Sequence, residues 1–258
     1  MLNTPESMAI VVFVVVGSSA FLWLLRRIWP TEQRVRHNEI IGWHVSVIGT
    51  TYAVIIGFML YAVWTTFELA DANAEAEANF LLNVVRSAQG LPSPQKQHIE
   101  DLASEYVTVM LTQEWPAMSE LKVSPVSHRV IQELWATVMS SQVRGPSEQT
   151  SLDHTLTELS AMTQHRRLRQ LQVGSTFPGI LWTVLIAGAI ATIMSACLFG
   201  SQDFKLHLMQ VLMLSTLISL VLVAIADINR PFQGSVHVAP VGFEHARATL
   251  DSMKSSNR

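Results

Sequence analysis

The stretch IIGWHVSVIGTTYAVIIGFMLYAVW, residues 40–64, decides the fold of this chain. It contains no Asp, Glu, Lys or Arg, and as an α-helix it is long enough to cross the hydrocarbon core of a bilayer, which is about 30 Å thick. Inside lipid, every backbone N–H and C=O must be paired within the segment, so the stretch can only be helical. It is therefore predicted to span a membrane.

Three further stretches, residues 8–25, 176–199 and 206–226, are equally apolar and contain no Asp, Glu, Lys or Arg. Charged residues make up only 14% of the chain, against about 25% in soluble domains. Arg26 and Arg27, not a small-residue cleavage site, follow the first stretch, so we expect it to stay as an anchor. These features predict an all-α, multi-pass membrane protein with four transmembrane helices.

The second transmembrane helix is expected to continue far beyond the bilayer. No Gly or Pro occurs between Gly57 and Gly90, and the intervening residues are rich in Ala, Glu and other strong helix formers. One continuous helix from Ile40 to Gln89 is the simplest interpretation. About half of its length would extend into a helical domain outside the membrane.

The chain is divided into four segments: residues 1–65 with the first two spans, 66–173 with the helical domain, 174–227 with the last two spans, and a tail, 228–258. Within the helical domain, Ser93–Pro94 is predicted to open a helix that ends at Trp115–Pro116. Two more helices are expected to start at Ser124–Pro125 and Gly145–Pro146. A short helix is predicted over 243–253 in the tail.

No motif in the sequence indicates catalysis, a metal site or a bound cofactor, and we do not expect an enzyme. The nine histidines are scattered, and none is spaced to place two metal ligands on one helix face. A net charge of −3 gives no basic surface for nucleic acid. The four spans carry no Asp, Glu, Lys or Arg that could couple transport to protons, and their two histidines, His44 and His207, are expected close to an interface, which argues against a coupled transporter.

Two stripes of residues stand out on the second span. Small residues recur at four-residue spacing and predict close helix packing: Gly49, Ala53 and Gly57. An adjacent stripe consists of Thr50, Val54 and Phe58. In a single chain this second stripe would be ordinary core or lipid contact, whereas in a ring of identical subunits it could line a hydrophobic constriction that gates by dewetting.

Several short motifs lie between about Asn38 and Phe243. They are Asn38-Glu39-x-x-Gly42, Gly49-x-x-Tyr52-Ala53-Val54-x-x-Gly57-Phe58, Trp64 with Glu75-Ala76-x-Ala78, Leu91-Pro92, Tyr106, Glu114-Trp115-Pro116, Arg167-Leu168-Arg169, Pro178-x-x-Leu181-Trp182 and Asp227-x-x-Arg230-Pro231-Phe232-x-Gly234. In these motifs the sequence resembles the bestrophin-like domain family of bacterial membrane proteins.

A more distant similarity is to the true bestrophins, which are pentameric anion channels. Gly57-Phe58 resembles a Gly-Phe pair in the neck of their pore, and the residues after Asn229 resemble a motif after their fourth span. Thr50 and Val54 are smaller than the corresponding neck residues. The acidic run that binds calcium in bestrophins is replaced by Ser235, Val236 and His237, so calcium gating is not expected.

The resemblance implies that the chain is a homo-oligomeric ion channel, a pentamer favouring small anions, in the inner membrane of a bacterial cell. The pore would be lined by the second helix, and Asp227, Arg230, Pro231, Phe232 and Gly234 would brace that helix at the membrane exit. The resemblance places the helical domain in the cytoplasm, whereas four arginines between Arg26 and Arg36 favour a cytoplasmic location for the first loop. The alternative is a non-conducting membrane scaffold or signalling protein whose helical domain binds a partner.

Overall fold

The computed structural model describes residues 4–256, and the outermost residues of the two predicted end segments, 1–3 and 257–258, lie outside it. Within the described residues all regular structure is helical, which confirms the predicted all-α class. Four helices are long and apolar enough to cross a membrane, and they coincide with the four predicted spans. The chain forms two compact units, one of residues up to 65 together with 176–229, and one of 66–175 together with residues from 230 onward.

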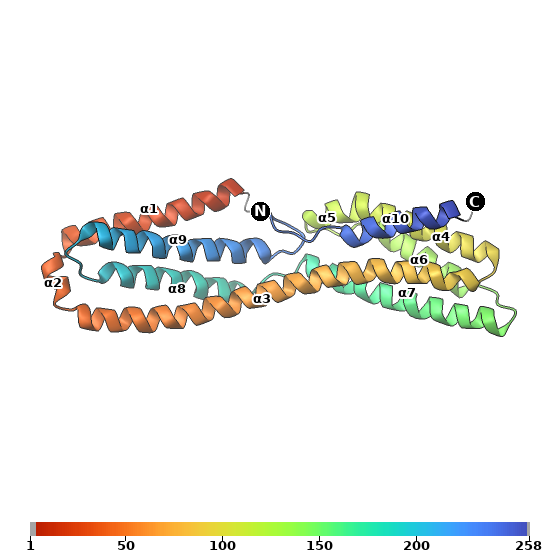
Figure 1. The fold of residues 1–258 in the computed structure, drawn as a ribbon, viewed down its shortest axis with the longest axis horizontal. Coiled ribbons are helices and arrows are strands. Elements are labelled where there is room, and N and C mark those ends of the chain that lie inside the picture. The colour runs from red at the N-terminus through yellow and green to blue at the C-terminus, as the bar shows by residue number, and fades with distance from the viewer. Residues whose placement is uncertain (1–3, 257–258) are drawn as a thin grey trace. The chain divides into compact units, whose positions relative to one another are not determined.

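The first unit, named here the membrane unit, contains α1 (Thr4–Ile28), α8 (Gly179–Leu198), α9 (Phe204–Ile228) and the first part of α3 (Asn38–Ser87). These helices lie side by side (Figure 1). Their inner side chains form two apolar clusters, one around Leu22, Tyr52 and Cys197 and one around Val63, Leu185 and Ile225.

The connection between α1 and α3 is ordered, because residues Thr31–Val35 form the short helix α2. Asn38 is the first residue of α3, and its amide pairs with the backbone of Gly200: Nδ2 donates to the Gly200 carbonyl, and Oδ1 accepts from the Gly200 N–H, both at 2.8 Å. The side chain therefore joins the start of α3 to the loop between α8 and α9.

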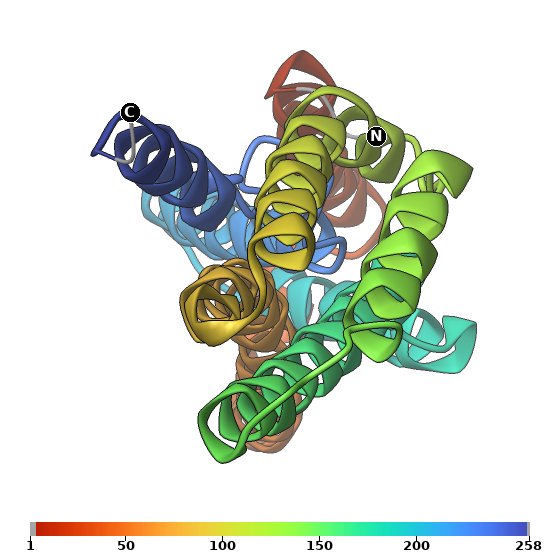
Figure 2. The ribbon, with the colours of Figure 1, turned by 90° about the vertical axis from the view of Figure 1, so that its right-hand side faces the viewer.

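The second unit, named here the helical unit, combines the last part of α3 with α4 (Ser93–Val109), α5 (Trp115–Ser119), α6 (Pro125–Met139), α7 (Pro146–Val173) and α10 (Val241–Ser256). Figure 2 looks along these helices and shows α4 beside α10 and α7 beside the end of α3. The core contains buried side chains from all the long helices, including Leu81, Ile99, Leu134, Leu159 and Phe243.

The predicted continuous helix is confirmed: α3 has 50 residues without interruption and is followed by a 3₁₀ turn, Ala88–Gly90. The predicted helix end at Trp115–Pro116 is wrong. The chain passes from α4 through a π-helical turn, Met110–Glu114, directly into α5, which continues to Ser119. Pro116 is the second residue of α5, directly after the π-helical turn, whose wider backbone accommodates the proline ring.

Candidate functional site

One side of the membrane segment of α3 is left uncovered by the rest of its unit. Only 6% of its most apolar window is buried, against 28% for α8 and for α9. The uncovered residues recur every three or four positions and therefore share one side of the helix, named here the outer face of α3: Val47, Thr50, Val54, Phe58 and Tyr61. Phe58 is 70% exposed and Val54 is 53% exposed. The three predicted pore-lining residues thus lie together on an open, uncharged face.

The predicted packing stripe makes no close helix contact within the chain. A Cβ atom added at Gly49 or Gly57 would meet nothing within 4 Å, and Ala53 is exposed. The stripe lies beside the outer face of α3, about 100° around the helix from its middle. Close packing of this stripe would therefore require a helix of another molecule, and the predicted packing role stays a prediction.

The opposite side of α3 is held by Tyr52, which sequence reasoning did not select for packing. Its side chain is 4% exposed, and its ring lies against Gly188 of α8. A Cβ at Gly188 would approach Tyr52 Cδ2 to 2.4 Å, so only glycine permits this contact. The available signal was the run of three small residues, Ala187-Gly188-Ala189, directly after the bulky residues 180–186. This contact fixes which face of α3 turns outward.

The predicted membrane-exit motif falls into both units. Asp227 lies in the last turn of α9, and Asn229 accepts a hydrogen bond from the backbone N–H of Phe177 through Oδ1 (3.3 Å), within the membrane unit. In the helical unit, Phe232 is 5% exposed and its ring meets Trp115 edge-on, with centroids 5.8 Å apart.

Phe232 belongs to an apolar cluster that includes Ala70 and Ala74 of α3. Arg230 donates to Gln233 Oε1 (3.1 Å), and the carbonyl of Pro231 accepts from Val238 N (2.7 Å). Gly234 has φ of 90°, a conformation that favours glycine. The motif is thus an ordered turn, and Phe232 places it next to α3.

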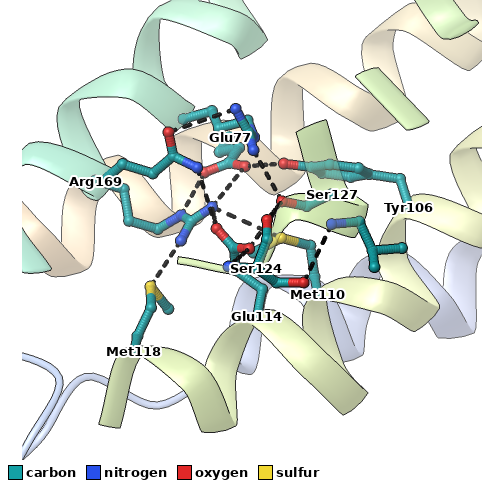
Figure 3. Close-up of polar contacts among 11 residues, drawn as sticks. Glu77, Tyr106, Met110, Glu114, Met118, Ser124, Ser127 and Arg169 are labelled. Atoms are coloured by element: carbon teal, nitrogen blue, oxygen red, sulfur yellow. Dashed lines mark hydrogen bonds and ion pairs between the residues drawn. The ribbon is translucent and has the colours of Figure 1, made fainter. Parts of the chain in front are cut away.

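A buried charge network, which sequence reasoning missed as a site, lies in the core of the helical unit (Figure 3). Arg169 of α7 donates from Nε to Glu77 Oε2 (2.6 Å) and from Nη2 to Glu77 Oε1 (3.2 Å), and neither side chain is exposed. The hydroxyl of Tyr106 donates a further hydrogen bond to Glu77 Oε1. The long helix is thereby linked to α4 and α7 by charge-assisted hydrogen bonds.

Glu114, in the π-helical turn, is the second buried acid of the network. Its Oε1 lies 3.5 Å from Arg169 Nη2, and its Oε2 accepts from the Ser127 hydroxyl (2.8 Å) and the Ser124 backbone N–H (3.0 Å). Arg166 in turn donates to the Ser127 hydroxyl (2.8 Å). Two carboxylates and two guanidinium groups therefore meet in one buried cluster.

The electrostatics favour a protonated Tyr106 and a charged Arg169. Burial, together with the Glu77 carboxylate, raises the pKa of Tyr106 well above its ordinary value of 10.0. Burial by itself lowers the pKa of Arg169, but the Glu77 charge and hydrogen bond outweigh it, and the pKa is raised above the ordinary value. Tyr106 is therefore protonated and Arg169 charged near neutral pH, and their contacts with Glu77 act as a structural clamp between α3, α4 and α7.

No group of three His, Cys, Asp or Glu residues that could hold a metal ion occurs between residues 4 and 256. The spans likewise contain no acidic side chain between residues 8–25, 40–64, 178–199 and 206–226.

Comparison with known proteins gives a consistent picture. The bestrophin-like domain profile matches residues 12–243, which includes the first span as well as the region from Asn38 onward. No curated protein matches the chain.

Solved structures share the fold. A bacterial bestrophin homolog from Klebsiella pneumoniae superimposes with a TM-score of 0.69 at 12% identity, covering 96% of this chain and 98% of that chain. A variant of that homolog gives a TM-score of 0.69 at 13% identity, with coverage of 96% and 98%. A crystal structure described only as a membrane protein gives 0.70 at 13% identity, with coverage of 94% and 98%. At these identities the likeness concerns the fold alone.

Proposed function

The chain is a membrane protein that belongs to the bestrophin-like domain family, and we propose that it is the subunit of a homo-oligomeric ion channel whose pore is lined by the outer face of α3. The observation that carries the proposal is that this face, with Thr50, Val54 and Phe58, is uncharged and uncovered within the chain. A pentamer in the bacterial inner membrane is the assembly that the family relationship favours.

The arrangement of α3 supports a ring of subunits. Four helices in one copy cannot easily enclose an aqueous path, whereas several copies of α3 around an axis can. The packing stripe of Gly49, Ala53 and Gly57 lies beside the outer face, where it would allow α3 helices of neighbouring copies to approach closely. The contact between Tyr52 and Gly188 would hold the opposite side of α3 against α8.

A ring of Phe58 side chains, with Val54 one turn away, would form a narrow apolar constriction. Such constrictions control conduction because water leaves them when they are narrow and returns when they widen. Neither residue carries charge, so the constriction would set the diameter of the pore more than its charge selectivity. Small anions are the ions that the family relationship favours.

The experiment is single-channel recording of the purified full chain in planar bilayers. Phe58→Ala is expected to raise conductance or leak, because it removes the largest side chain from the constriction. Phe13→Ala on α1, where the side chain is 79% exposed, makes the same chemical change on another helix and should leave conductance unchanged. Reversal potentials in asymmetric chloride salts identify the permeant ion.

Silence of both the wild-type chain and Phe58→Ala would overturn the proposal. If mass photometry in detergent then showed a monomer or dimer, the protein would be the alternative, a non-conducting scaffold or signalling protein whose helical unit binds a partner. Neither outcome changes the family assignment.

A further inference from the structure

A basic pocket lies at one end of the membrane unit, between the end of α1 and the start of α9. It has a volume of about 460 Å³ and is lined by Trp23, Arg26, Arg27 and Phe204. The Arg26 guanidinium lies over the Phe204 ring, 4.8 Å from its centroid, and the Arg27 guanidinium lies 5.7 Å from the Trp23 centroid. An aromatic ring accepts no hydrogen bond from the edge of a guanidinium group, so the N–H groups can still bind an anion.

The positive charge of this pocket is not neutralised by the protein. Within residues 4–256, neither Arg26 nor Arg27 forms an ion pair, and Arg26 Nη1 is a buried donor with no partner. The nearest acid in sequence to Phe204 is Asp203, whose Oδ1 accepts from the backbone N–H groups of Lys205 (2.9 Å) and Leu206 (3.1 Å) at the start of α9. That carboxylate serves as a helix cap.

A third arginine, Arg34, adds to the positive charge near Arg26. Arg34 is fully buried in α2 and donates from Nη1 to the carbonyls of Cys197 (3.0 Å) and Phe199 (3.4 Å) at the end of α8. Its Nε has no partner in the described part of the chain. Burial lowers the pKa of Arg34, and the nearby charge of Arg26 lowers it further.

The position of the pocket restricts the anion that it would meet. Arg26 and Arg27 lie in the last turn of the membrane-spanning α1, and Phe204 is the first residue of the membrane-spanning α9. The ends of transmembrane helices lie at the depth of lipid headgroups, where Trp and Arg side chains commonly gather. A phosphate at this depth is presented by a lipid, and its acyl chains would run along the apolar surface of the same two helices.

We propose that Arg26 and Arg27 form a phosphate-binding site for an anionic phospholipid, with Trp23 and Phe204 as the apolar floor. The two guanidinium groups bind one phosphate through charge-assisted hydrogen bonds. The site selects anionic lipids, because the cation of a zwitterionic headgroup would be repelled by the positive charges of Arg26 and Arg27. It is separate from the outer face of α3, so it is independent of ion conduction.

The test is native mass spectrometry of the full chain in detergent with phosphatidylglycerol, phosphatidylcholine or inorganic phosphate added. Retention of phosphatidylglycerol over phosphatidylcholine by about tenfold is expected, the ratio that corresponds to one charge-assisted contact. Arg27→Gln should reduce this preference several-fold. The double variant Arg26→Lys with Arg27→Lys should keep more of the preference than Arg27→Gln does, because both positive charges remain.

Arg36→Gln is the matched control, since Arg36 is an exposed arginine in the same connection but does not line the pocket. Equal retention of the two lipids, or equal loss of preference in Arg36→Gln and Arg27→Gln, would overturn the proposal. Displacement of phosphatidylglycerol by millimolar inorganic phosphate would show a free-anion site and overturn the lipid assignment. Arg27 is exposed, so its replacement should leave the fold intact, as circular dichroism can verify.

Discussion

Arg169 and Glu77 form a two-point ion pair in the core of the helical unit, with both side chains completely buried and the shortest N–O distance 2.6 Å. The pair joins α7 to α3, the helix whose first part carries the proposed pore face. Replacing both charges with apolar groups could be tolerated, but removing one leaves the other buried and unbalanced.

Glu77→Gln is therefore expected to destabilise the protein by about 3 kcal/mol, the lower end of the range for breaking a buried pair, because Glu114 remains near Arg169. Thermal unfolding in detergent, followed by circular dichroism, measures the effect. Glu120→Gln makes the same substitution at an exposed ion pair with Lys122 and should leave the melting temperature unchanged. Equal melting temperatures for the two variants would show that the buried pair contributes nothing.

Tyr106 gives a prediction about pH. Its pKa is raised in the folded protein, whereas in the unfolded chain it is near 10.0, so unfolding above pH 10 releases a proton. The stability contributed by Tyr106 is complete below pH 10 and declines as the pH rises above it. Tyr106→Phe should cost about 1–2 kcal/mol at pH 7, through the lost hydrogen bond to Glu77.

The difference in melting temperature between the wild type and Tyr106→Phe should then narrow from pH 9 to pH 11, because phenylalanine has no proton to lose. Other tyrosines titrate in both proteins and cancel from the difference. A constant difference over that range would contradict a raised pKa of Tyr106.

The four spans and the long helix could be predicted from the sequence, whereas the buried charge network and the helix boundary at Trp115 could not, and the reason is physical. Charge-free stretches and a long run without Gly or Pro each restrict the chain to helix, so the spans and α3 could be predicted locally. Glu77 looked like an ordinary helix former because its burial depends on Arg169, which is distant in sequence. Trp115–Pro116 looked like a helix end because the π-helical turn that accommodates it has no local signal.

The candidate site divides in the same way. The stripe of Thr50, Val54 and Phe58 follows from helical spacing alone, and it does lie on one open face. Which side of α3 faces inward could not be predicted, because it depends on the fit of Tyr52 against Gly188 in another helix. The arginine pocket likewise could not be predicted, because Arg26 and Phe204 are distant in sequence and come into contact only in the folded chain.

Gly188→Ala is expected to destabilise the membrane unit by about 1–3 kcal/mol, the usual cost of inserting a methyl group into a packed core. The added Cβ would lie 2.4 Å from Tyr52 Cδ2, and the ring must shift. Gly179→Ala, at the start of the same helix, adds a methyl group where nothing lies within 4 Å and should be neutral. Thermal unfolding of the two variants in one detergent provides the comparison, and a neutral Gly188→Ala would show that α8 and α3 pack less closely.

Gly57→Leu separates contacts within the chain from contacts between copies. A Cβ atom added at Gly57 meets nothing within 4 Å, and the position is exposed in the single chain, so the melting temperature of the dissociated subunit should not fall. If Gly57 lies against α3 of a neighbouring copy, leucine holds the two helices apart and the assembly dissociates. Mass photometry is expected to show smaller particles for Gly57→Leu than for the wild type.

Gly17→Leu on α1 introduces the same side chain at another exposed glycine with open space around it, and it should leave the assembly intact. This control distinguishes a specific interface from a general effect of added bulk in the membrane. Dissociation caused by Gly17→Leu but not by Gly57→Leu would place the subunit interface on α1. The outer face of α3 would then contact lipid, and Phe58 would have no pore to constrict.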